Sequence, residues 1–211
     1  MIEKTARALG RNDETPNIDL ALELITTKNI KGIKEIVDGV TGCSEPVAND
    51  CIKVLYEIGE REPSLIAEYV TTFISLLRSK NNRLVWGAMT ALSKIAFLKP
   101  REIFAHIDII IKAYENGSVI TVDNSITVFA ELVKAGPDFA KKVFPLLIRH
   151  LETCRPKEVG QHAERAFVCV TKTTAGQFAD VLTKRRDSLT DPQKKRVDRL
   201  LKRVDAGRYG S

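Results

Sequence analysis

Residues 83–117 read RLVWGAMTALSKIAFLKPREIFAHIDIIIKAYENG, and this stretch decides the fold. Its first half repeats apolar residues three and four positions apart, which is the spacing of one face of an α-helix. These residues are Leu84, Ala88, Ala91, Leu92 and Ile95. Pro100 interrupts the stripe, a second stripe runs from Ile103 to Tyr114, and Gly117 ends it. The stretch therefore predicts a hairpin of two helices.

The same hairpin recurs along the chain. Sliding the sequence by 37 residues brings Pro63 onto Pro100 and then onto Pro137, at the same point between two helices. The first helices that superpose carry Cys51, Val54, Leu55 and Ile58, then Ala88, Ala91, Leu92 and Ile95, then Ser125, Val128, Phe129 and Leu132. Each hairpin alone leaves an apolar face that only a stacked neighbour buries. We therefore predict an all-α protein, a right-handed α-solenoid of antiparallel helix pairs.

We expect one domain over residues 1–211, because the repeats follow one another without a linker. Its predicted parts are an N-terminal leader, a degenerate helical pair, four repeats and a capping helix, at 1–16, 17–44, 45–188 and 190–205. The last helix is amphipathic, with an apolar face at Val197, Leu200 and Val204. A polar outer face on the last helix closes the open end of a stack.

Residues 82–96, NRLVWGAMTALSKIA, resemble the second helix of a HEAT-type (HEAT/armadillo-like) helical repeat, and the resemblance covers residues 45–188. It implies a binding scaffold. The family usually carries an Asp and an Arg that link repeats in a polar ladder. The corresponding positions here read Ser44, Asn81, Ser118 and Pro156 for the Asp, and Ala48, Val85, Val122 and Gly160 for the Arg. We therefore expect apolar packing to hold the repeats together.

The resemblance also implies that the second helix of each repeat lines a concave surface. On the helix from Arg83 to Phe97, Trp86 lies opposite the apolar stripe and is the only tryptophan of the chain. Trp and Arg are enriched at interface hot spots. The predicted site for a protein or peptide partner comprises Trp86, Arg83, Asn49, Lys53, Thr90, Lys94 and Asp123. In the alternative interpretation, Trp86 packs against an adjacent repeat or against the stems of two of these lysines.

The net charge of +6 is confined to one end of the chain. Residues 184–211 hold ten basic and four acidic residues, and the rest of the chain has 23 of each. A basic helix can bind nucleic acid or an anionic membrane surface, so nucleic-acid binding is the second functional hypothesis. The candidate anion-binding residues are Lys184, Arg185, Arg186, Lys194, Lys195, Arg199, Lys202 and Arg203. The competing interpretation is a solvated capping face, since four aspartates are interleaved among them.

HEAT-like DNA glycosylases offer an enzyme alternative. They resemble this chain as small basic repeat proteins that use Trp and Asp in a DNA-binding groove, and Trp86 and Asp123 would occupy adjacent rungs here. Those enzymes use several aromatic residues and a basic groove, whereas this ridge has one tryptophan and balanced charge. The sequence also lacks phosphate-binding glycine loops and a Gly-x-Ser-x-Gly motif. We therefore expect no catalytic residue.

We also expect no cofactor and no metal site. His106 stands alone beside Asp108, and His150 and His162 lie in different predicted helices without a cysteine at zinc spacing, so we expect surface histidines. The four cysteines form no Cys-x-x-Cys pair, and Cys51 and Cys169 fall within apolar helical stripes. Reduced cysteines, the absence of a long apolar run and a start unlike a signal peptide favour a cytoplasmic protein.

Overall fold

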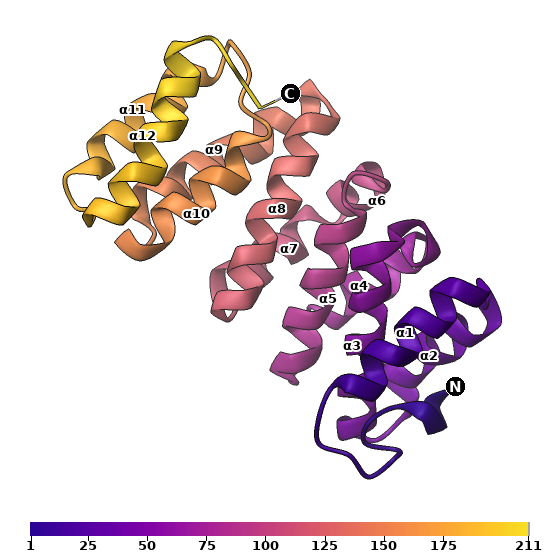
Figure 1. Cartoon of the computed structure of the whole chain (residues 1–211). Coiled ribbons are helices and arrows are strands. Elements are labelled where there is room, and N and C mark those ends of the chain that lie inside the picture. The colour runs from indigo at the N-terminus through magenta and orange to yellow at the C-terminus, as the bar shows by residue number, and fades with distance from the viewer. Residues whose placement is uncertain (211) are drawn as a thin grey trace. The chain divides into compact units, whose positions relative to one another are not determined.

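The computed structural model describes residues 1–210, in which there are twelve α-helices and no β-strand (Figure 1). The predicted all-α class is confirmed. The helices group into two compact units, Met1–Ser125 and Ile126–Ser211, with the boundary inside α8 (Val119–Ala135). The predicted domain boundaries, the handedness and the capping role of the last helix stay predictions.

The first unit contains seven complete helices before α8. They are α1 (Thr15–Thr27), α2 (Ile30–Gly42), α3 (Glu45–Arg61), α4 (Val70–Leu76), α5 (Asn82–Ile95), α6 (Pro100–Ala105) and α7 (Ile107–Asn116). Helix α3 packs against α1, α2 and α5, and α4 packs against α5. Pro63 begins a short 3₁₀ helix and Pro100 begins α6, as expected of a residue that lacks a backbone N–H to donate. Leu55, Ile58 and Ile95 are fully buried, so the predicted stripes form the core.

The second unit contains the remaining helices of the chain. They are α9 (Pro137–Thr153), α10 (Pro156–Phe167), α11 (Ala175–Arg186) and α12 (Asp191–Asp205). Helix α10 packs against α9, α11 and α12. Pro137 is the first residue of α9, and a capping box between Thr190 and Gln193 starts α12. Val197 and Leu200 bury the apolar face of α12.

Side-chain hydrogen bonds in the first unit join equivalent helices of neighbouring repeats. Asn81 donates to Asn49 Oδ1 over 2.8 Å, and Asn124 donates to Thr90 Oγ1 over 3.0 Å. Ser93 lies 3.1 Å from Asn124 Oδ1 and donates to it. The expectation that apolar packing holds the repeats together is thus incomplete, because Asn81 stands at the position of the family's Asp and keeps a polar link.

Equivalent links occur in the second unit. Arg165 of α10 donates to Thr127 Oγ1 over 2.8 Å, and Arg196 of α12 donates to Glu164 Oε1 over 3.0 Å. The donors and acceptors of these links are 32 to 38 residues apart, close to the repeat length. We call the bonds of both units the inter-repeat ladder. Asparagine, threonine, serine, arginine and glutamate build it in place of an Asp–Arg pattern.

Candidate functional site

Trp86 forms a cluster with Arg83 of its own helix and Tyr56 of α3. The Trp86 and Tyr56 ring centroids are 5.8 Å apart, with an angle of 47° between the rings. The Arg83 guanidinium lies 5.3 Å from the Trp86 ring centroid, within range of a cation–π interaction. Both aromatic side chains are half-buried. The structure therefore brings together two predicted residues and adds Tyr56, which the sequence analysis missed.

Glu14, just before α1, ties this cluster to the N-terminal segment. Its carboxylate accepts from Arg83 at 2.6 Å and lies 3.0 Å from Lys53 Nζ. The Lys53 ammonium also pairs with Glu57, with Nζ 2.7 Å from Oε1, and lies 4.9 Å from the Tyr56 ring centroid. We call the following set the Trp86 cluster: Glu14, Lys53, Tyr56, Glu57, Arg83 and Trp86. Charge of both signs fixes its side chains in place.

Lys53 is a correction to the predicted site, because only 7% of it is exposed. Burial lowers the pKa of its ammonium, but hydrogen bonds to Glu57 and Glu14 outweigh burial and hold the pKa above its ordinary value. The lysine is therefore a charged internal support. The helical register predicted an exposed position for Lys53. It could not indicate that Glu14, which lies outside the repeat, pairs with this lysine.

A hollow of about 470 Å³ lies beside the cluster in the first unit. Two predicted residues, Asn49 and Arg83, line it, together with carboxylates such as Asp13, Glu14 and Glu45. The backbone N–H of Arg7 donates to Asp50 over 2.6 Å, so the N-terminal segment forms part of the wall. The hollow can accept a basic or hydrogen-bonding side chain of a partner.

The remaining predicted residues of the ridge serve structural contacts. Thr90 accepts from Asn124 and donates to the carbonyl oxygen of Trp86 over 2.8 Å. Lys94 forms an ion pair with Glu60 of the preceding repeat. Asp123 is half-buried on α8 and is not among the lining residues of the hollow. Of the predicted ridge, Trp86, Arg83 and Asn49 therefore remain as candidates for contact with a partner.

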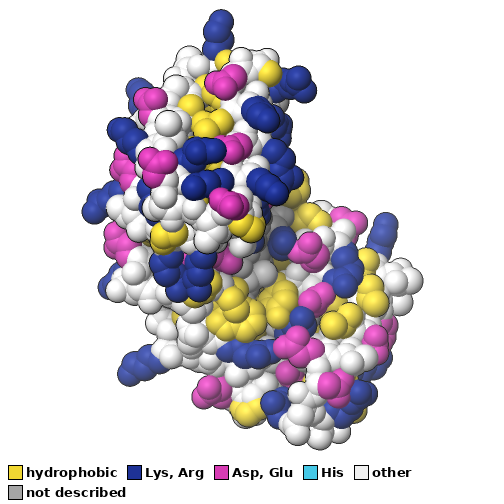
Figure 2. Space-filling view, turned by 60° about the vertical axis from the view of Figure 1, so that its left-hand side comes forward, with side chains coloured by type: hydrophobic (Ala, Val, Ile, Leu, Met, Phe, Trp, Pro, Cys, Tyr) yellow, Lys and Arg dark blue, Asp and Glu magenta, His cyan; other side chains and the backbone are white. Residues whose placement is uncertain are grey.

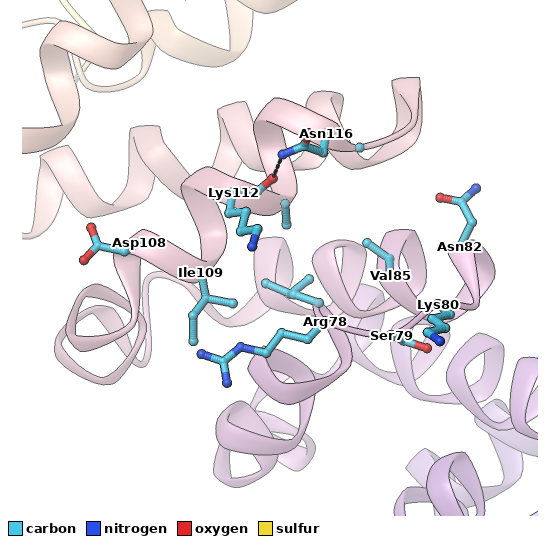
Figure 3. A pocket seen from close by; sticks show the side chains of 12 residues that line it. Arg78, Ser79, Lys80, Asn82, Val85, Asp108, Ile109, Lys112 and Asn116 are labelled. Carbon is cyan, nitrogen blue, oxygen red and sulfur yellow. Dashed lines mark hydrogen bonds between the residues drawn. The ribbon is translucent and has the colours of Figure 1, made fainter.

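A second groove, which the sequence analysis missed, lies on another side of α5. It has a volume of about 770 Å³ and is lined by residues 77–80, which follow α4, by the start of α5 and by one face of α7. Figure 3 shows Lys112 pointing into the groove from α7, Arg78 extending below Ile109, and Val85 on the facing helix. The walls combine apolar side chains with three basic residues and one acidic residue, Asp108. Nothing local in the sequence places α7 opposite α4.

Four of the predicted anion-binding residues make internal contacts, and one of these is a hydrogen bond of 3.3 Å from Arg199 to the carbonyl oxygen of Lys195. Arg185 donates to three backbone carbonyl oxygens at the end of α9, Arg186 binds Asp198 at 2.8 and 3.1 Å, and Arg203 covers the Phe167 ring at 4.3 Å. Figure 2 shows basic and acidic side chains interspersed over the face of the second unit that it brings forward. The other four are exposed or half-buried, namely Lys184, Lys194, Lys195 and Lys202.

The expectation of surface histidines is wrong for two of the three. His150 is 5% exposed and His162 is fully buried, and their rings meet through a hydrogen bond of 2.7 Å. The two helices that carry them, α9 and α10, are consecutive and antiparallel neighbours, so residues twelve apart face each other. His106 is exposed as expected. Cys51 and Cys169 are buried free thiols, as their apolar stripes predicted.

No protein-family model and none of the curated proteins matches the chain. An engineered protein of the Northeast Structural Genomics Consortium aligns at a TM-score of 0.67 and 18% identity, over 98% of this chain and 97% of its own. A designed armadillo repeat protein in complex with the peptide (KR)4 aligns at a TM-score of 0.67 and 12% identity, over 87% of this chain and 85% of its own. A computationally designed armadillo repeat protein for modular peptide recognition aligns at a TM-score of 0.65 and 12% identity, over 89% of this chain and 91% of its own.

These likenesses show that the chain has the fold of a HEAT/armadillo-like helical repeat protein, which confirms the resemblance at the level of fold. They add no residue correspondence, since the identities are low. Within residues 1–210, no helix combines the length and the hydropathy needed to cross a bilayer.

Proposed function

We propose that the protein is a non-enzymatic scaffold that binds a protein or peptide segment through the Trp86 cluster and the hollow beside it. The observation that carries the proposal is the half-buried Tyr56–Trp86 pair with Arg83 above it. Trp, Tyr and Arg are the residue types that dominate interface energetics. The designed armadillo repeat proteins of similar fold are described as peptide binders, which supports this class of function.

The cluster is ordered before a partner arrives. Glu14 holds Arg83 by an ion pair of 2.6 Å, and Arg83 in turn restricts the Trp86 ring. Side chains that are already fixed lose little conformational entropy on binding, so more of the contact energy contributes to affinity. The mixed charges favour a partner that offers an apolar side chain to Trp86 and a basic side chain to the carboxylates of the hollow. Reduced cysteines are consistent with the proposed cytoplasmic location.

Panning a random peptide library on the purified full chain tests the proposal. We expect enriched peptides to shift the fluorescence of Trp86, the only tryptophan. Trp86→Ala should weaken their binding by about tenfold or more, the effect of losing a hot-spot residue. Phe97→Ala is the matched control, because Phe97 is an aromatic residue in the same unit, 55% exposed and outside the cluster. Equal losses for the two variants, or none, would refute the assignment.

The nucleic-acid alternative remains a separate prediction, which concerns the exposed basic residues of α11 and α12. Retardation of DNA or RNA that weakens steeply with salt would support it. The comparison variant replaces Lys195, Arg199 and Lys202 by glutamine in the full chain. If the wild-type protein binds neither DNA nor RNA at low salt, the nucleic-acid alternative is refuted.

A further inference from the structure

Three side chains that bind transition metals meet between α9 and α10 in the second unit. His150 lies in the last turn of α9, Cys154 is the residue that ends this helix, and His162 lies in the middle of α10. One ligand atom from each, two ring nitrogens and the thiol sulfur, lie within 4.8 Å of one another. Both histidines are buried and Cys154 is half-buried, so the thiol forms the side that solvent can reach.

We propose that His150, Cys154 and His162 form a binding site for a zinc ion, with one coordination position left for water. Imidazole nitrogen and thiolate sulfur are the donors that zinc prefers, and three protein ligands with an open fourth position are common for this ion. Softer ions such as Cu(I) share part of this preference, whereas magnesium and calcium take oxygen ligands.

The geometry needs only small movements. Tetrahedral zinc with Zn–N of about 2.0–2.1 Å and Zn–S of about 2.3 Å separates its ligand atoms by roughly 3.3–3.6 Å. The histidine nitrogens, now 2.7 Å apart in their hydrogen bond, must move slightly apart, and the sulfur must move inward. The sulfur makes only a contact of 4.0 Å to the Leu151 carbonyl oxygen, so rotation of its side chain breaks no strong bond.

The backbone of the turn that carries Cys154 is held by Arg185. The guanidinium donates to the carbonyl oxygens of Leu151 and Cys154 at 2.9 and 2.6 Å, and also to that of Glu152. Burial raises the pKa of the Cys154 thiol, and the positive charge of Arg185 acts in the opposite direction. Arg185 thus holds the turn that carries the ligand and offsets part of the effect of burial, and the pKa of the thiol stays above its ordinary value.

Binding of the ion is a balanced exchange. The Sγ–H bond of Cys154 breaks, its proton passes to solvent, and the sulfur forms a bond to zinc. The proton shared by the two facing ring nitrogens must leave, and the ring that carried it takes up a proton at its outer nitrogen. One proton is released for each ion bound, so affinity should rise with pH.

Cobalt(II) is the probe for this site, because it occupies zinc sites and reports thiolate coordination by colour. The reduced, chelator-treated full chain should take up one cobalt ion with visible d–d bands of tetrahedral intensity and a sulfur-to-cobalt charge-transfer band. Zinc should displace it. In Cys154→Ser the charge-transfer band should vanish and affinity should fall by more than about 100-fold, since even second-shell changes cost 10- to 100-fold.

Cys43→Ser is the matched control, because Cys43 is the other half-buried thiol and should leave the spectrum unchanged. His150→Gln should weaken binding while keeping the charge-transfer band. Circular dichroism establishes that each variant is folded, and zinc should raise the melting temperature of the wild-type protein but not that of Cys154→Ser. The proposal is overturned if the folded wild-type chain gives no cobalt spectrum, or if Cys154→Ser gives the same one.

Discussion

The side-chain amide of Asn81 donates a hydrogen bond of 2.8 Å to Asn49, one repeat earlier, while its oxygen accepts from the backbone N–H of Arg83 at the start of α5. One residue thus caps a helix and links two repeats. Asn81→Ala should lower the free energy of unfolding by about 1–2 kcal/mol, through loss of the cap and of the link. Urea unfolding measures it. Asn82→Ala, one residue further and exposed, should change it by less than about 0.5 kcal/mol.

The ion pairs of Glu57 predict a pH dependence of stability. Burial raises the pKa of this carboxyl, but hydrogen bonds from Lys53 and Arg61 outweigh burial and hold the pKa below its ordinary value. A lowered folded-state pKa adds stability that is fully present above the unfolded value of about 4.3 and is lost as pH falls through the folded value.

Glu57→Gln should therefore destabilise the protein by about 1–2 kcal/mol at pH 7, and the difference from wild type should shrink as pH falls below about 4. Urea unfolding at a series of pH values measures the difference. The exposed Glu68→Gln serves as the control, with little effect at any pH. A difference for Glu57→Gln that stays constant down to pH 3 would show that the ion pairs do not act through this carboxylate.

Gly117 ends α7 where a side chain has no room. A Cβ there would lie 2.5 Å from the carbonyl oxygen of Ala113 and 2.6 Å from Thr121 Cβ. Gly117→Ala should cost about 1–3 kcal/mol, the range seen for overpacked sites. Gly42→Ala is the matched control at the end of α2, where nothing lies within 4 Å, and it should be neutral or stabilising by up to about 1 kcal/mol. Thermal unfolding of both variants compares them directly.

The four cysteines should divide into two classes of reactivity. Burial raises the pKa of Cys51 and of Cys169 to about 12 and shields both thiols from solvent. Cys43 and Cys154 are only half-buried, although burial raises the pKa of Cys154 as well. The thiolate is the reactive form, so a chromogenic disulfide reagent at pH 8 should label two thiols of the folded protein and four after unfolding. In Cys43→Ser only one thiol should react before unfolding. Labelling of all four at one rate would contradict the burial of the apolar stripes.

Most of the helices could be predicted because they rest on local patterns. The break between α6 and α7 at His106 was not predicted, because the apolar stripe from Ile103 to Tyr114 continues across it. Pro63, Pro100 and Pro137 mark the same turn in successive repeats, and each apolar stripe needs only its own helix to be recognised. The contact between Arg83 and Trp86 was accessible for the same reason, since residues three apart share a helix face.

The parts that the sequence left open depend on neighbouring elements. Tyr56 reaches Trp86 only through the register of α3 on α5, and the burial of Lys53 requires Glu14 from outside the repeat. The four-residue spacing of His150 and Cys154 is a local signal that the expectation of no metal site overlooked, since residues four apart lie on one side of a helix. His162 joins them through the turn between α9 and α10, whose geometry no helical periodicity encodes.

The inter-repeat ladder also has a consequence for how the chain acquires its structure. Each of its bonds closes a loop no longer than the 38 residues between Thr127 and Arg165. Short loops cost little entropy to close, and contacts of low sequence separation form quickly. During synthesis, each rung can therefore form once the next helix has left the ribosome, so the nascent protein is stabilised step by step from its N-terminus.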